Sequence, residues 1–275
     1  LQVEVHTDGT LGQEREMMES LQIGNLDLAL VSTAPISNFY SQMSVLDMPY
    51  LFDSKAHAYA VLDGEIGQSL FDGLESQGMV GLTYMENGFR NVFSTKPITK
   101  PADLKGVKIR IMENQIQTAT FSALNAIVTN MASGEVYTGL QQGTIDGAEQ
   151  SAALLCDNQL YDYGKYLTLL DAVAVCGMFV MDREMYDKMP ADLQAIIDET
   201  CVETMKMAWA SFGDIEAQAT QTLIDNGVTI TELTAEEKAA FTDRISGIKG
   251  EMFAETPATE ELYNHIQDTL ARLGY

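Results

Sequence analysis

The chain has 275 residues, with 16 Lys and Arg against 40 Asp and Glu, and its formal net charge is −24. So acidic a protein argues against nucleic acid or an anionic membrane as its partner, because binding to phosphates needs a basic surface. No apolar run approaches the roughly 18 residues of a membrane span, and the length suggests about two domains.

The first third of the chain alternates between short apolar runs typical of strands and longer segments typical of helices. We expect strands over residues 1–5, 26–32 and 79–85, and helices over residues 11–23, 56–62 and 66–76. Gly24 fits the C-cap of the first helix, and the apolar composition of 26–32 predicts a strand buried on both faces. The rhythm favours a mostly parallel sheet. Because residue 1 already lies in a predicted strand, we also expect an upstream segment to be missing.

The middle third repeats this pattern. Strands are expected over residues 90–94 and 107–112, on either side of a loop with two prolines and a closing glycine. A helix follows over 116–124 and a short strand over 126–129. Ser133 is expected to cap a helix that extends through Gln142 and ends at Gly143.

The last third is mainly helical after one buried strand, which is expected within the ten apolar residues Ala172–Met181. A helix begins at Pro190 and can continue past Gly213 to Leu223, which would make it about 50 Å long at about 1.5 Å per residue. A helix of that length exceeds one small domain, so we expect it to span two. A short strand over 228–230 and two amphipathic helices complete the chain, and Thr234–Glu237 forms a capping box.

Cations are scarce in this protein, so the positions of Arg90 and Arg110 are informative. Arg90 ends an apolar strand-like run, and Arg110 lies inside the alternating run Val107–Ile111. An arginine on a strand beside a cleft presents a planar fork of donors that matches a carboxylate. The alternative is two exposed arginines paired with nearby acids, since most arginines lie at the surface.

Residues that carry metal, redox or nucleophilic chemistry are few and widely spaced. The three histidines have no partner spacing, and Cys156, Cys176 and Cys201 are too far apart for a metal knuckle or a redox pair and suggest buried thiols. The chain contains no zinc-protease, nucleophile-elbow or phosphate-loop motif. The sequence therefore gives little support to an enzyme, and we expect no cofactor and no metal site.

Five motifs in a fixed order carry a family resemblance. They are Leu11–Arg15 (LGQER), Asn87–Arg90 (NGFR), Pro101–Arg110 (PADLKGVKIR), Gly134–Gln150 (GEVYTGLQQGTIDGAEQ) and Met189–Gln194 (MPADLQ). Together they resemble the solute-binding proteins of tripartite ATP-independent periplasmic (TRAP) transporters. The resemblance extends over essentially the whole chain, and five ordered motifs are far more specific than any single one.

The resemblance implies an α/β fold of the periplasmic-binding-protein type, with two lobes and a long helix that spans both. We expect lobe I over residues 1–87 and 176–215, with its first strand and helix missing, and lobe II over residues 88–175 and 216–275. The resemblance also implies a periplasmic, monomeric protein. Such a protein closes around a small carboxylate ligand and delivers it to integral membrane subunits of a TRAP transporter.

The resemblance also implies which residues bind the ligand. Arg110 matches the family's carboxylate clamp, Arg90 matches a second arginine that assists it, and Glu149 is expected to buttress Arg110. Gln150 stands where the family has an asparagine, and Ser133 stands where many relatives have an aromatic residue, which predicts a roomier or more polar pocket. Lobe I is expected to face the arginines with Ser32, Thr33 and Glu14, because ligands bind beyond the carboxyl ends of strands. The remaining candidates are Asn114 as a ligand contact, and Asn87 and Met131 as supporting residues.

The ligand itself stays open among C4-dicarboxylates, sugar acids, keto acids and other monocarboxylates. Ser133 and Gln150 favour a sugar acid, and the alternative is that water fills the extra space around a smaller acid. Two other classes of protein remain: an enzyme on a similar two-lobe scaffold, which would show a titratable dyad in the cleft, and the ligand-binding domain of a receptor.

Overall fold

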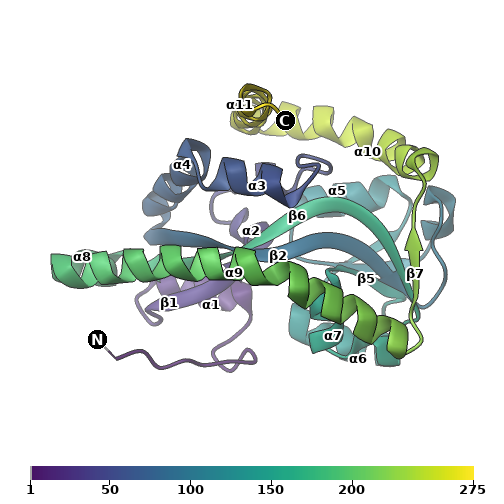
Figure 1. Cartoon of the computed structure of the whole chain (residues 1–275), viewed down its shortest axis with the longest axis horizontal. Helices are drawn as coiled ribbons and strands as arrows, with labels where there is room; N and C mark the ends of the chain where they lie inside the picture. Colours follow the sequence, from purple (N-terminus) through teal and green to yellow (C-terminus); the bar gives the residue numbers. More distant parts are fainter. Residues whose placement is uncertain (1) are drawn as a thin grey trace.

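The fold is one mixed β-sheet surrounded by helices (Figure 1), and the computed structural model describes residues 2–275. The strands are β1 Leu28–Ser32, β2 Met79–Ser94, β3 Lys108–Ile111, β4 Ile127–Asn130, β5 Gly147–Gln150, β6 Tyr166–Asp182 and β7 Thr229–Glu232. The α-helices are α1 Glu14–Gln22, α2 Thr33–Ile36, α3 Lys55–Leu62, α4 Glu65–Leu74, α5 Gln115–Ala123, α6 Val136–Gln141, α7 Ala152–Asp157, α8 Arg183–Lys188, α9 Ala191–Asp225, α10 Ala235–Glu255 and α11 Pro257–Leu273. The 3₁₀ helices are η1 Ser41–Asp47, η2 Glu75–Gln77, η3 Pro101–Leu104, η4 Ser133–Glu135 and η5 Leu160–Asp162.

The sheet has the strand order β1-β6-β2-β5-β3-β4, and β7 pairs with β6. The two long central strands β2 and β6 are antiparallel, and so are the pairs β1–β6 and β2–β5. Only β3–β4, β3–β5 and β6–β7 are parallel. The expectation of a mostly parallel sheet is therefore wrong. The two longest strands, β2 and β6, run antiparallel to each other, and β1 and β5 pair antiparallel with them.

The strand β2 unites two segments that the sequence predicts as separate strands, residues 79–85 and 90–94. Its pairing with β6 shifts register between Glu86 and Phe89. Gly88, within that irregularity, has a φ of 76°, a conformation that favours glycine. The sequence around Glu86–Gly88 is therefore typical of a loop, although the residues before and after this irregular segment pair with β6 in one continuous strand.

The long helix α9 confirms the expectation of a helix that continues past Gly213. It has 35 residues, and Figure 1 shows it running in front of the sheet from the side of β1 to the side of β5 and β7, with a bend along its course. It contacts the strand β2 and the helix α7.

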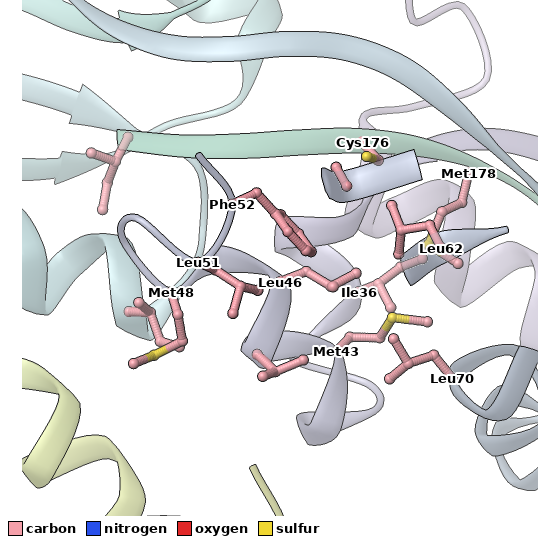
Figure 2. Packing of buried hydrophobic residues seen from close by; sticks show 14 of the residues in the cluster. Ile36, Met43, Leu46, Met48, Leu51, Phe52, Leu62, Leu70, Cys176 and Met178 are labelled. Carbon is pink, nitrogen blue, oxygen red and sulfur yellow. The ribbon is translucent and has the colours of Figure 1, made fainter. Parts of the chain in front are cut away.

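The hydrophobic core is concentrated where η1, α2, α3 and α4 pack on the two central strands. Figure 2 shows Ile36, Met43 and the nearby Phe52 packed below β6, the strand that carries Cys176. The thiol of Cys176 is buried, whereas Cys156 and Cys201 are only half-buried.

The last two helices attach to different parts of the molecule. The helix α10 contacts α5 and η3, whereas α11 contacts η1 and α3. The predicted lobe boundaries did not anticipate that α11, assigned to lobe II, packs against segments assigned to lobe I. The division of the chain into two lobes stays a prediction.

Three local expectations differ from the structure. Residues 2–5 have no regular secondary structure, and Val3 and Val5 are exposed, so the strand expected over 1–5 does not form within the described residues; Leu1 lies outside them. The edge strand β1 is not buried on both faces, since Leu30 is 49% exposed. The segment after Ala132 begins as the 3₁₀ turn η4 and becomes α-helical only at Val136.

Candidate functional site

A cavity of about 290 Å³ is lined by residues of the central strands β2 and β6 and of β1, β3 and β5. Its polar lining consists of Glu14, Ser32, Glu86, Asn87, Arg90, Arg110, Ser133 and Gln150. Its apolar lining consists of Leu30, Val31, Met85, Met112, Leu154 and Gly177. The structure therefore brings together seven of the eleven candidate residues: Glu14, Ser32, Asn87, Arg90, Arg110, Ser133 and Gln150.

Arg110 is the cavity's available cation. The strand β3 positions it between β4 and β5, and the side chain is 2% exposed. Its Nε donates to the backbone carbonyl of Met131 at 2.8 Å, whereas its buried Nη1 has no partner and no carboxylate pairs with it among the side chains that the structure describes (residues 2–254 and 256–275). Burial, and next the charge of Arg90, lower the pKa of Arg110 to about 10. The guanidinium therefore remains charged at neutral pH and lacks an anionic partner.

Arg90, in contrast, is already paired. Its Nε and Nη2 donate to the two carboxylate oxygens of Glu149 at 2.7 and 2.9 Å, and Nη2 also donates to the Glu149 backbone carbonyl at 2.7 Å. Both side chains are almost fully buried. The Glu149 carboxylate is thus paired with Arg90, and its charge also raises the pKa of Arg110 against the effect of burial. That Glu149 buttresses Arg110 stays a prediction.

Gln150 and Ser133 line the cavity near Arg110. Gln150 ends β5 and is 1% exposed, and its Oε1 is buried without a hydrogen-bond partner. Ser133 begins η4 just after Met131, whose carbonyl holds Arg110. Two residues of the same lining thus carry unpaired groups within the described part of the chain, an acceptor at Gln150 Oε1 and a donor at Arg110 Nη1. They suit a ligand that carries both an acceptor and a hydroxyl donor.

Glu14 and Ser32 reach the cavity from the elements near the β1 edge. Glu14 is the first residue of α1, and its Oε1 accepts a hydrogen bond from the Ser32 backbone N–H at 2.6 Å. Thr33 does not line the cavity: it is fully buried at the start of α2. The α2 turn begins directly after β1, and this directs the two neighbouring side chains to different places.

Asn114 also lies outside the cavity and has a structural role. Its Oδ1 caps α5 by accepting from the Gln117 N–H at 2.9 Å. Its Nδ2 donates to the Ala34 carbonyl, to Ser37 Oγ and, at 2.8 Å, to Asp47 Oδ2. Burial, and next the charge of Glu149, raise the pKa of Asp47 to about 8. Every polar atom of the Asn114 amide is thus engaged by the protein itself.

Sequence reasoning missed Glu86 and most of the apolar wall. Glu86 directly precedes the Asn87–Arg90 motif, and its Oε1 accepts from the Gly88 N–H at 2.8 Å. Burial raises the pKa of Glu86, and the nearby charge of Lys55 opposes this rise. The signal that could have revealed Glu86 is its place in the same irregular strand segment as the motif. The wall residues carried no such signal, because buried methionines and leucines are common in any core.

The site combines a free buried guanidinium, unpaired hydrogen-bonding groups and an apolar wall, which is an arrangement for holding a small anion. Among the side chains that the structure describes, those of residues 2–254 and 256–275, no group of three or more His, Cys, Asp or Glu is placed to hold a metal ion. No helix in this part of the chain is long and apolar enough to cross a membrane.

The α/β fold, the long crossing helix and the unpaired arginine in a polar cavity together indicate a solute-binding protein. Comparison with known proteins agrees with this class. The profile of the family described as "Bacterial extracellular solute-binding protein, family 7" (DctP) matches residues 1–256. The chain belongs to this family, whose members are the periplasmic solute-binding proteins of TRAP transporters.

Three relatives illustrate the similarity. A solute-binding protein of Verminephrobacter eiseniae is 37% identical over 90% of this chain and 74% of its own length. The C4-dicarboxylate-binding periplasmic protein DctP of Rhodobacter capsulatus is 30% identical over 91% of this chain and 76% of its own. A crystal structure of a TRAP periplasmic solute-binding protein from Sulfitobacter, with bound β-D-galacturonate, has a TM-score of 0.93 at 26% identity and covers 96% of this chain and 88% of that one. The fold class and the periplasmic localisation expected from the sequence are thereby confirmed.

Proposed function

We propose that this protein binds a small hydroxylated organic acid of the sugar-acid class in its central cavity, with Arg110 as the carboxylate clamp. The observation that carries the proposal is the Arg110 guanidinium, which is buried and charged and whose Nη1 lacks a partner. A buried donor without a partner costs roughly 1–3 kcal/mol, and more when it is charged. A ligand carboxylate would satisfy it with charge-assisted hydrogen bonds.

Hydroxyl groups on the ligand are supported by the rest of the lining. Gln150 Oε1 lacks a donor, and Ser133 and Glu14 offer further polar atoms to the same space. The relatives bind both kinds of acid: one is named for C4-dicarboxylates, and another was crystallised with galacturonate. The lining of this chain favours the second kind, because it contains more hydroxyl-binding groups than unpaired cations.

We infer that the bound acid is delivered, by a monomer and without turnover, to the integral membrane subunits of a TRAP transporter. Membership of a solute-binding family supports this role. The strongly acidic composition would steer encounter with basic loops of a membrane partner, since complementary charge raises association rates.

A thermal-shift screen against sugar acids, C4-dicarboxylates and keto acids tests the proposed function. A ligand at 100 times its dissociation constant adds about 2.7 kcal/mol of stability, which raises the melting temperature measurably. We expect at least one sugar acid to stabilise the protein and neutral sugars not to. Stabilisation by neutral sugars or amines alone, with no effect from any carboxylate, would refute the proposal.

A further inference from the structure

The charged side chains that line the cavity can compensate the charge of only one ligand carboxylate. Four ionisable side chains line it: Arg90, Arg110, Glu14 and Glu86. Arg90 is neutralised from behind by the bidentate contact with Glu149. Arg110 is therefore the single lining cation without a carboxylate partner, and two acids share the cavity with it.

Glu14 is the acid best placed to act on a ligand. Its Oε1 is held by the Ser32 N–H, which fixes the carboxylate, and its Oε2 makes no hydrogen bond to the described part of the chain. Glu14 comes from α1 near the β1 edge of the sheet, whereas Arg110 comes from β3 near the opposite edge. Both side chains line the same cavity, and the charge of Glu14, after that of Glu149, raises the pKa of Arg110 against the effect of burial. A ligand bound to Arg110 consequently extends toward a fixed negative charge.

The chemistry of the distal end of the ligand then decides its affinity. A hydroxyl there can donate a hydrogen bond to Glu14 Oε2, which is stronger than a neutral hydrogen bond because the acceptor is charged. A second carboxylate there cannot donate and is repelled, and at a separation of about 6 Å near a protein surface this repulsion corresponds to roughly 100-fold in affinity.

We propose that Glu14 is the specificity-determining residue that restricts this site to acids with a single carboxylate, by accepting a hydroxyl and repelling a second carboxylate. This inference rests on the proposed function, because it assumes that Arg110 binds the first carboxylate. It goes beyond that function, because Arg110 alone would bind a C4-dicarboxylate and a sugar monoacid equally, whereas Glu14 would distinguish them.

Matched ligand pairs test the proposal by isothermal titration calorimetry. Erythronate and meso-tartrate form the shorter pair, and galactonate and galactarate form the longer one. Within each pair only the end group changes, from an alcohol to a carboxylate. Any tighter acid found in the screen is added with its counterpart that carries a carboxylate at the other end. We expect the wild type to prefer the monoacid of the tightest pair by about 100-fold.

The substitution Glu14→Gln should narrow that preference at least tenfold, mainly through tighter binding of the diacid. Glutamine keeps an acceptor for the Ser32 N–H, removes the charge, and places an amide donor where Glu14 has Oε2. Glu19→Gln is the matched control: it lies on the same helix, removes the same charge, is exposed beside Arg15, and should leave the ratio unchanged.

Two results would overturn the proposal while leaving the proposed function intact: a wild type that binds a diacid as tightly as its monoacid, or a Glu14→Gln ratio equal to that of Glu19→Gln. Failure of every carboxylate to bind would instead remove both. Melting curves of each variant without ligand show whether it is folded.

Discussion

Arg90 and Arg110 are equally buried and line the same cavity, yet their surroundings give them different tasks. Arg90 has a bidentate carboxylate within the protein, whereas Arg110 has one backbone carbonyl and an unpaired Nη1. A buried charge needs compensation. Folding supplies this compensation to Arg90 through Glu149, whereas we expect the carboxylate of a bound ligand to supply it to Arg110.

The substitution Arg110→Ala should abolish ligand binding and leave the fold intact. Loss of one partner of a desolvated charge pair costs about 2–5 kcal/mol, or about 30-fold to several thousand-fold in affinity. Arg110→Lys should also bind poorly, because an ammonium cannot form the planar fork. Calorimetry measures both affinities, with melting curves as the folding control. An affinity for Arg110→Ala close to that of the wild type would mean that the carboxylate binds elsewhere.

The substitution Glu149→Gln should destabilise the protein, because it leaves the charge of Arg90 buried without a counterion. Breaking a buried pair in this way costs about 3–5 kcal/mol. Glu113→Gln is a suitable control, because its pair with Arg15 is exposed and such pairs contribute about 0–1 kcal/mol. Urea denaturation measures both variants. Equal stability of the two would show that Arg90 finds another partner.

Asp47 should make stability depend on pH. Its pKa is raised in the folded protein to about 8, above the 3.8 of a free carboxyl, so the folded state holds the proton more tightly than the unfolded state. The stability that Asp47 contributes is therefore fully present at low pH and is lost as the pH rises from about 4 to about 8. Asp47→Asn cannot titrate and still offers an oxygen to Asn114. We expect the variant to gain stability relative to the wild type between pH 5 and pH 8, by urea denaturation. A pH-independent difference would contradict the raised pKa.

At the scale of elements, one asparagine connects several segments near the cavity. Asn114 caps α5 and donates to Ala34 at the start of the α2 turn and to Asp47 at the end of η1. Asn114 therefore connects segments that are far apart in sequence. It also fixes the end of the short loop that begins with Met112, a residue of the cavity wall.

The substitution Asn114→Ala should cost more than the loss of a helix cap alone. An N-cap contributes about 0.5–2 kcal/mol, and an unsatisfied buried acceptor at Asp47 adds about 1–3 kcal/mol. Thr234→Ala, which removes the exposed cap of α10, serves as the matched control and should show only the first cost. Chemical denaturation compares the two, and losses of equal size would show that the buried contacts of Asn114 contribute nothing.

At the scale of the molecule, the long strands β2 and β6 and the helix α9 are shared by both ends of the sheet. The irregular segment of β2 around Gly88 lies opposite β6 near Gly177 and beside the cavity, which both Asn87 and Gly177 line. Glycines there can absorb dihedral change that other residues resist. A ligand that contacts both sides of the cavity would favour the more closed arrangement.

We expect the radius of gyration to decrease when ligand binds, with hinges near Asn87–Gly88 and Val175–Gly177 and bending of α9. Small-angle scattering with and without a ligand from the thermal-shift screen measures this change, and Arg110→Ala provides the unliganded control under identical conditions. An unchanged radius in a sample with confirmed binding would mean that the protein holds its ligand without closing.

The sequence by itself predicted most helices and strands, the long helix, the family, and Arg90 and Arg110 as residues of the site. It could do so because periodicity, capping residues and motif order are local properties. Its misses have a common cause. Which carboxylate pairs with which arginine depends on how β2, β3 and β5 align, so the sequence did not predict the bidentate contact between Glu149 and Arg90.

Tertiary structure alone decided the strand directions and the composition of the cavity. Thr33 and Asn114 stand beside residues that line the cavity, but a helical turn and a cap orient their side chains into the protein interior. Glu86 enters the cavity through an irregular strand whose pairing no local pattern reveals. A binding site assembled from many separate segments is fixed by packing between them, and this is the information that a linear pattern lacks.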